Sequence, residues 1–325
     1  MMQQDANNQP LREATRLAPS PTGALHLGNA RTFVVNWILA RRRDWRVVLR
    51  IEDLDGPRVK PEAIGQTIEV LEWLGLDWDE GPILQSEDRE RHMGAVAELA
   101  ARGLAYPCAL TRTEIEAAAS APHLGGAPAS PPMRPVDLRP AAFRDAGTNW
   151  RFVMPDREVQ IDDACAARSV HRPLDDAGDV VIWTKRGMAA YHLAVVADDH
   201  AQGITHVVRG DDLLPSAAVQ RCLYDALGIG PLPAYAHLPL VVGPDGRRLA
   251  KRHGDSRLVR YRDAGVPPER ILGLLASWSV PDPDPGPARE PLDLEAFAAR
   301  FDLDTMPRDP ARFTPEDDAW LLGRS

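Results

Sequence analysis

Polar residues of complementary types occur in three groups that lie far apart in the sequence. The first is Arg16-Leu-Ala-Pro-Ser-Pro-Thr-Gly, followed by His26-Leu-Gly-Asn, and the second is Arg50-Ile-Glu-Asp. The third comprises Arg209-Gly-Asp-Asp and Arg248-Leu-Ala-Lys-Arg. Guanidinium groups hold carboxylates, a carboxylate holds an ammonium, and helix-start N–H groups with lysine hold phosphates. Together the groups indicate one pocket for an amino acid and ATP, which only the folded chain can assemble.

The segment from Pro19 to Asn29 is typical of a phosphate-binding helix start. Two prolines and Gly23 predict a tight exit from a strand, and Gly28 lets a phosphate approach the backbone. N–H groups of the first helical turn lack partners within the helix, and His26 can donate as well. Taken alone, the His-x-Gly-Asn pattern favours an ordinary surface histidine in front of a helix.

The other residues also have structural explanations when each is considered alone. Glu52 fits a surface salt bridge, Tyr191 fits a core aromatic at a strand start, and Arg209 fits an ion pair with Asp211 or Asp212. It is their combination that favours a binding site.

Hydrophobic periodicity predicts the elements that must position these residues. Strands and helices alternate at the start of the chain, which predicts an α/β fold with a parallel sheet. The expected elements are a strand over 14–18, a helix over 27–43, a strand over 45–51 and helices over 61–74 and 89–102.

The chain then changes character between Pro107 and Arg144, where the Gly/Pro/Ala-rich stretch 121–135 predicts an inserted unit. Alternation resumes over 151–161, and the apolar run 190–197 predicts a strand in the middle of the sheet. Helices are expected over 216–227, 268–277, 292–301 and 315–322. We therefore divide the chain into a flexible N-terminus (1–11), a Rossmann-like catalytic domain in two halves (12–105 and 190–241), an inserted unit (106–189) and a loop with a helical unit (242–325).

Composition narrows the class of protein. The chain has 325 residues, 44% of them hydrophobic, and it shows neither a signal-like start nor an apolar run of about 18 residues, which predicts a cytoplasmic protein without membrane contact. Its net charge of −9 argues against non-specific binding of nucleic acid, but it does not exclude binding of tRNA. The basic stretch 247–262 fits a phosphate-facing strip and a solvated loop equally well.

Read as a whole, residues 16–31 resemble the HIGH segment of class I glutamyl-tRNA synthetases, Arg50-Ile-Glu-Asp resembles their next strand end, and Arg248-Leu-Ala-Lys-Arg resembles their KMSKS loop. The resemblance extends from about Arg12 to Trp278. It implies a class I synthetase Rossmann-like parallel sheet with an inserted acceptor-end unit and a small helical stem-contact unit. Alanine at 250 and arginine at 248 depart from the loop's usual serine and lysine.

The resemblance also implies roles for individual residues. It places Arg16, Ala18, Ser20, Glu52, Tyr191 and Arg209 around glutamate, with Glu52 on the ammonium and Arg209 on a carboxylate. ATP would contact His26, Gly28, Asn29, Arg248 and Lys251. His26 and Lys251, with Mg²⁺, would stabilise charge on the leaving pyrophosphate.

Short members of this family, the glutamyl-Q tRNA(Asp) synthetases, lack an anticodon-binding domain and attach glutamate to the queuosine base of tRNA(Asp). The length of this chain and its 191–209 segment fit that group, and we expect a monomer. Such members often bind zinc through cysteines of the inserted unit; of that set only Cys108 is present, so we predict no zinc.

Three alternatives remain open. The stretch 301–316 is similar to the last helices before the anticodon region of ordinary glutamyl-tRNA synthetases, which favours a truncated paralogue acylating tRNA(Glu). A non-catalytic module that binds glutamate, ATP or RNA is a second alternative, because of Arg248 and Ala250. Another nucleotidyl-transferring enzyme of the H-x-G-H type is a third, but it would not need Glu52, Tyr191 and Arg209.

Overall fold

The structure is a computed structural model, and it describes residues 12–55, 59–109, 134–135, 137–145, 147–247, 249, 255–281 and 289–324. The predicted flexible N-terminus, most of the Gly/Pro/Ala-rich stretch and most of the Lys251 loop lie outside these residues. Within them, no helix is both long and apolar enough to cross a membrane.

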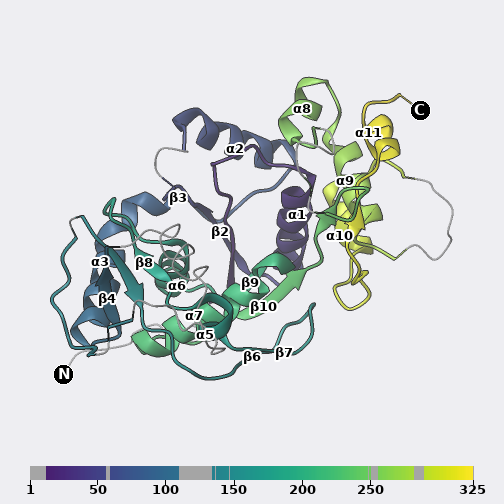
Figure 1. The fold of residues 1–325 in the computed structure, drawn as a ribbon. Helices are drawn as coiled ribbons and strands as arrows, with labels where there is room; N and C mark the ends of the chain where they lie inside the picture. Colours follow the sequence, from purple (N-terminus) through teal and green to yellow (C-terminus); the bar gives the residue numbers. More distant parts are fainter. Residues whose placement is uncertain are drawn as a thin grey trace, which may run out of the picture.

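A parallel sheet forms the centre of the molecule (Figure 1). Strands β1 (Ala14–Leu17), β2 (Arg46–Ile51) and β3 (Glu80–Leu84) pair in that order and in parallel. A second parallel pair, β9 (His206–Gly210) and β10 (Ala234–Leu238), lies beside β1, where the N–H of Thr205 donates to the carbonyl of Ala14. The predicted α/β fold with a parallel sheet is confirmed, although residues from distant parts of the chain complete it.

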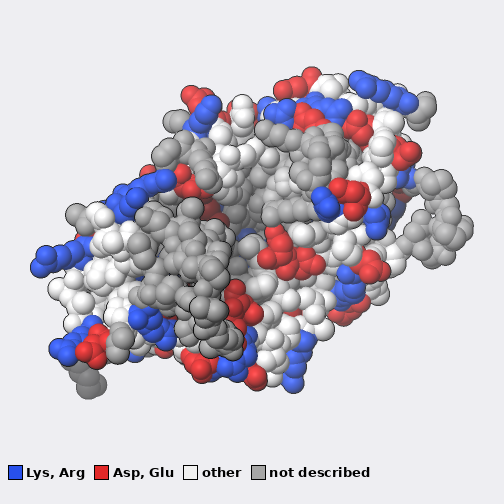
Figure 2. Space-filling view, in the orientation of Figure 1, with Lys and Arg blue, Asp and Glu red and all other residues white. Residues whose placement is uncertain are grey.

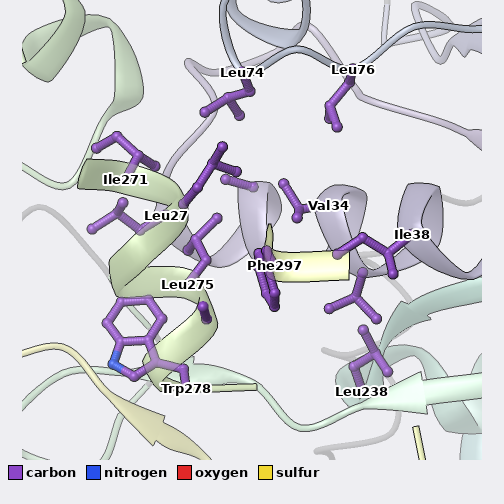
Figure 3. Packing of buried hydrophobic residues seen from close by; sticks show 14 of the residues in the cluster. Leu27, Val34, Ile38, Leu74, Leu76, Leu238, Ile271, Leu275, Trp278 and Phe297 are labelled. Atoms are coloured by element: carbon purple, nitrogen blue, oxygen red, sulfur yellow. The ribbon is translucent and has the colours of Figure 1, made fainter. Parts of the chain in front are cut away.

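One face of this sheet shares a core with the C-terminal helices. Helices α1 (Leu27–Arg42) and α2 (Pro61–Trp73) pack there with α8 (Leu258–Asp263), α9 (Pro268–Ser277), α10 (Leu294–Arg300) and α11 (Pro315–Leu321). Figure 3 shows Leu27 and Val34 of α1 beside Leu275 of α9 and Phe297 of α10. The C-terminal helices therefore have no separate core of their own.

A buried arginine reinforces this contact. The side chain of Arg31 donates from Nη2 to the carbonyl of Trp278 at 2.9 Å, from Nε to the hydroxyl of Ser279 at 3.0 Å and from Nη1 to the carbonyl of Pro239 at 2.6 Å. It is 1% exposed, and burial lowers its pKa to about 10, so it is still charged at neutral pH. Because it joins α1 to the end of α9, it fixes the helix that begins after His26.

A second core covers the other face of the sheet. It contains α3 (Arg89–Ala101), α6 (Tyr191–Ala201) and α7 (Leu214–Leu227) together with the antiparallel strands β4 (Ala105–Cys108), β5 (Asn149–Phe152) and β8 (Val181–Trp183). Shorter elements connect these: η2 (Gln85–Asp88), the hairpin β6 (Val159–Ile161) and β7 (Ser169–His171), α5 (Pro173–Ala177), η3 (Asp211–Leu213), β11 (Val241–Val242) and β12 (Ala311–Arg312). Much of the range that we expected to be an inserted unit thus forms antiparallel structure.

The strand predicted over 190–197 is wrong, because these residues form the helix α6. Its apolar side chains from Leu193 to Ala197 are all buried, and the helix packs against α3, α7 and β8. A short apolar run has no period that separates a buried helix from a buried strand. Tyr191 consequently begins a helix rather than a strand.

Candidate active site

The alternation of side chains along the strands brings three arginines onto one face of the sheet. In β2, Val48 faces the second core, so Arg50, two residues on, faces the same way. Val207 and Arg209 are related in the same manner in β9, and Arg16 lies on this face of β1. Helix α6 covers this face, and the carboxylate of its Asp199 forms salt bridges with both Arg16 and Arg50.

A cavity of about 240 Å³ opens where these strands end. It is lined by residues of five separate segments of the sequence, among them Arg16, Ala18, His26, Gly28, Asn29, Glu52, Tyr191 and Arg209. The structure therefore brings into one pocket five of the six residues predicted around glutamate and three of those predicted around ATP.

Ser20, the sixth, is exposed and lines an adjoining cavity of about 610 Å³ together with Gln85, Arg186 and Met188. The two cavities share Glu52 and Tyr191. Ser20 thus lies next to the pocket rather than in its wall, with its hydroxyl 3.3 Å from that of Thr22.

Glu52 follows β2 at the base of the pocket and is not a surface residue, since its side chain is 14% exposed. It accepts from Nη2 of Arg50 at 3.3 Å, and Arg16 and Asp199 lie near enough to influence its charge. Burial raises the pKa of Glu52 above its ordinary value, and the two arginines oppose that shift. A surface salt bridge is therefore the wrong explanation for this residue; an ionised carboxylate here gains from a cation in the pocket.

Arg209 also lines the pocket and is buried, and its three nitrogens donate to three different groups. Nε donates to Nε2 of His237 at 2.9 Å, Nη1 to the hydroxyl of Tyr191 at 3.4 Å and Nη2 to the carbonyl of Leu213 at 3.3 Å. These donations, rather than pairing with Asp211 or Asp212, hold its side chain. Tyr191 is 36% exposed, so it is not a core aromatic either.

His26 is the N-cap of α1. Its Nδ1 accepts from the N–H of Gly28 at 3.1 Å and of Asn29 at 3.4 Å, while the Asn29 side chain accepts from the N–H of His26 at 3.2 Å. The expectation that these helix-start N–H groups are unpaired is therefore wrong. Because Nδ1 acts as an acceptor, the neutral ring carries its proton on Nε2.

Comparisons with known proteins agree with this geometry. Residues 13–314 match the family model described as tRNA synthetases class I (E and Q), catalytic domain. The chain belongs to this family. The resemblance expected from the sequence and the class I fold are thus confirmed, and the chain carries the catalytic domain of a ligase.

Individual relatives cover most of the chain. A protein of Symbiobacterium thermophilum named glutamyl-Q tRNA(Asp) synthetase is 44% identical over 322 residues, which are 95% of this chain and 98% of that protein. A glutamate–tRNA ligase of Synechococcus sp. strain WH7803 is 40% identical, over 94% of this chain and 66% of the ligase. Among solved structures, a glutamate tRNA ligase from Elizabethkingia meningosepticum in complex with its amino acid matches with a TM-score of 0.75 and 27% identity, over 95% of this chain and 68% of that one.

Two predicted ATP-binding residues of the synthetase, Arg248 and Lys251, lie outside the described residues. The chain that follows them is bound to the start of α1: the N–H of Leu27 donates to the carbonyl of Ser256 at 3.1 Å, and the N–H of Leu258 to that of Leu25 at 2.8 Å. The backbone immediately after the Lys251 loop is therefore next to His26.

The described arginines of the basic stretch 247–262 are largely engaged within the synthetase. Arg257 pairs with Asp255, Arg260 with Asp318 and Arg262 with Glu69. Figure 2 shows blue and red residues intermixed over the visible face rather than gathered in one basic strip. For these three arginines the structure favours intramolecular pairing over a phosphate-facing role.

Cys108 is buried at the end of β4, and the other positions compared with zinc ligands lie outside the described residues or are not cysteines. Among the residues that the structure describes, no three His, Cys, Asp or Glu side chains are placed to hold a metal ion. The absence of zinc stays a prediction.

Four residues behind the pocket received no role in the sequence analysis: Arg50, although it belongs to a quoted motif, Asp199, and the pair Asp163 and His237. Asp199 is 2% exposed and His237 is fully buried. Arg50 and His237 each occupy the interior of an apolar strand, where a charged or polar residue needs a buried partner. A polar residue inside an apolar strand is therefore the sequence signal that could have identified Arg50 and His237.

Proposed function

We propose that this synthetase activates L-glutamate with ATP and transfers it to the queuosine base of tRNA(Asp). The observation that carries the proposal is the single cavity that Glu52, Arg209 and the capping residue His26 all line. The names and identities of the relatives support glutamate as the amino acid and tRNA(Asp) as the acceptor.

The charges of the pocket favour glutamate over a neutral amino acid. Two guanidinium groups, those of Arg16 and Arg209, line the cavity together with the carboxylates of Glu52 and Asp212. Two cationic groups are available for the two carboxylates of glutamate, and a carboxylate is available for its ammonium. In this proposal Glu52 accepts from the substrate ammonium and Arg209 donates to its side-chain carboxylate, beside Arg16 and Tyr191.

ATP lies over the start of α1 in this proposal and brings Mg²⁺ with it, since magnesium is commonly held by substrate phosphates and water. An α-carboxylate oxygen of glutamate attacks the α-phosphorus, the bond to the bridging oxygen breaks, and pyrophosphate leaves. His26, through its Nε2–H, and Lys251 stabilise the charge that develops on the leaving group. No side-chain nucleophile is required, because the reaction depends on positioning and electrostatics.

In the second step a hydroxyl of the modified base attacks the carbonyl carbon of glutamyl-adenylate, and AMP leaves. The cavity that contains Ser20 and Arg186 adjoins the pocket at Glu52 and Tyr191, so it offers the acceptor a route to that carbonyl.

Two measurements test the proposal. Glutamate-dependent exchange of pyrophosphate into ATP reports the first step, and its absence would exclude an activating enzyme and favour a non-catalytic module. Transfer of labelled glutamate to tRNA(Asp) with and without queuosine, compared with tRNA(Glu), reports the second. Labelling of tRNA(Glu) alone would instead identify a glutamyl-tRNA synthetase paralogue.

A further inference from the structure

A buried histidine connects Arg209 to a carboxylate from a distant part of the chain. His237, in β10, accepts from Nε of Arg209 at 2.9 Å, and its Nδ1 lies 2.5 Å from Oδ2 of Asp163. The side chains of His237 and Asp163 are both fully buried. Neither residue lines the cavity, and Arg209 is the lining residue to which His237 is hydrogen-bonded.

The protonation states of Asp163 and His237 follow from the groups that surround them. Hydrogen bonds from His237 and from the N–H groups of Cys165 and Ala166 hold the pKa of Asp163 at about 2, against the cost of burial, so it is a carboxylate. Burial lowers the pKa of His237, and Arg209 and Arg16 lower it further although Asp163 opposes them. The imidazole is therefore neutral, donates from Nδ1 to Asp163 and accepts at Nε2 from Arg209.

The orientation of the guanidinium group is also fixed by stacking. The ring of Tyr235 lies 5.6 Å from that of His237 with an angle of 23° between their planes, and the guanidinium carbon of Arg209 lies 5.5 Å from the centre of the same tyrosine ring. Tyr235 thus packs against both partners of the hydrogen bond.

Some N–H groups of Arg209 remain available to a ligand. A guanidinium group has five N–H bonds, and in the described part of the chain those of Arg209 make three hydrogen bonds, one from each nitrogen. The two that remain belong to Nη1 and Nη2, one on each. One N–H on each terminal nitrogen is thus left to donate to the two oxygens of a carboxylate, and we refer to this pair as the fork of Arg209.

Asp163 lies in the connection between β6 and β7. Hydrogen bonds donated by backbone N–H groups join this connection to strand β10 of the sheet. The N–H of Ala164 donates to the carbonyl of Tyr235 at 2.9 Å, and the N–H of His237 donates to Asp163 at 3.0 Å. The hairpin β6–β7 is thereby fastened to β10 behind the pocket.

We propose that Asp163 and His237 are positioning residues that hold the fork of Arg209 toward the side-chain carboxylate of glutamate and so set the preference for glutamate over glutamine. This inference rests on the proposed function. It assigns to the β6–β7 connection a part in amino-acid selection although it lies outside the pocket.

The test compares the KM for glutamate with the KM for ATP in pyrophosphate exchange. His237→Leu removes the acceptor, and Asp163→Asn lets an amide donate to Nδ1, which moves the ring proton to Nε2 and opposes the N–H of Arg209. For both we expect the KM for glutamate to rise about tenfold or more while the KM for ATP stays within about twofold, as for loss of a hydrogen bond to a charged group. The ratio of glutamate to glutamine activation should fall in both.

Two further variants separate positioning from structure. In His237→Gln the amide can donate to Asp163 and accept from Arg209, so most of the glutamate affinity should return. His92→Leu is the matched control, because His92 also forms a buried pair with an aspartate, Asp198 at 2.8 Å, and Asp198 retains Gln85 and Arg91. It should lower the melting temperature without a selective effect on glutamate.

The inference is overturned if His237→Gln is as impaired as His237→Leu, if both KM values rise together, or if His92→Leu shows the same selective loss. Failure of the proposed function is distinguishable, because it would appear in the unsubstituted protein as an absence of glutamate-dependent exchange.

Discussion

Arg16 and Arg50 converge on a single atom: Oδ1 of Asp199 lies 3.5 Å from Nε of Arg16 and 2.6 Å from Nη1 of Arg50. The two arginines come from neighbouring strands and the carboxylate from α6, and all three are buried. Asp199 thus pairs with two cations at the interface between sheet and helix, and Glu52 also accepts from Arg50.

Replacing this anion should strongly destabilise the fold. Asp199→Asn leaves two buried guanidinium groups short of a counter-charge, and breaking a buried pair in this way costs about 3 kcal/mol or more. Urea unfolding at pH 7 measures the loss. Asp162→Asn is the control: its partner Arg168 is as exposed as Asp162 itself, so the change in unfolding free energy should be close to zero. Equal losses of unfolding free energy in the two variants would show that the buried carboxylate of Asp199 stabilises the fold no more than an exposed one.

Glu52→Gln should have opposite effects on stability and on substrate binding. Burial raises the pKa of Glu52 in the folded protein, so its stabilising contribution is complete at low pH and is lost as the pH rises through that value. At pH 7 the ionised group therefore opposes folding, and the amide should raise the melting temperature.

The same variant should raise the KM for glutamate by about tenfold or more, since the ammonium loses an ionic partner. Arg50 keeps Asp199 and Gln202 in the variant. A lower melting temperature at pH 7 would contradict the electrostatic argument.

Gly28→Ala should disturb the cap of α1. A Cβ at this position would lie 3.0 Å from Cε1 and 3.1 Å from Nδ1 of His26, so the ring must move away from the N–H groups that it accepts from. We expect a loss of about 1 kcal/mol in stability, as for other N-cap losses. Pyrophosphate exchange should fall as well, because the proposed donor on Nε2 moves with the ring.

The matched control for stability is Gly23→Ala in the preceding turn, where an added Cβ meets nothing within 4 Å. Its unfolding free energy should remain unchanged, and a loss equal to that of Gly28→Ala would refute the steric explanation.

His192 should make the protein less stable in mild acid. Burial, helped by Arg209, lowers its pKa to about 4, from an ordinary value of 6.5. Its Nδ1 is buried without a hydrogen-bond partner in the described part of the chain. Between these two pH values the unfolded chain binds a proton that the folded chain does not, so the free energy of unfolding decreases as the pH falls.

The urea midpoint at pH 7.5 and at pH 5 measures this effect. In His192→Asn the difference between the two midpoints should be smaller than in the unsubstituted protein, whereas at pH 7.5 and pH 8.5 both proteins should show equally little change. An unaltered acid response in the variant would assign it to other groups.

The sequence predicted the elements with clear periods well. The helix over 268–277 matches α9 residue for residue, and the order of strands and helices before residue 100 indicated the parallel sheet. Family motifs also selected residues that meet in one pocket, including Glu52 and Arg209, which are far apart in the chain.

The errors have identifiable physical causes. The run 190–197 is buried almost all round, so its period carried no information, and the helix was mistaken for a strand. The role of His26 as a cap depends on a ring rotamer that no motif encodes. His237 and Asp163 lie outside every motif that was singled out, and only the pairing of β9 with β10 brings the histidine to Arg209.

The hydrophobic contact of α1 with α9 and α10 determines what a truncated fragment of this enzyme would lose. A fragment ending after β11 would strip the cover from Leu27 and Val34 and leave the guanidinium of Arg31 without its bonds to Trp278 and Ser279. The start of α1 at His26 would lose the helices that support it from behind, so this part of the pocket depends on the C-terminal helices for its stability.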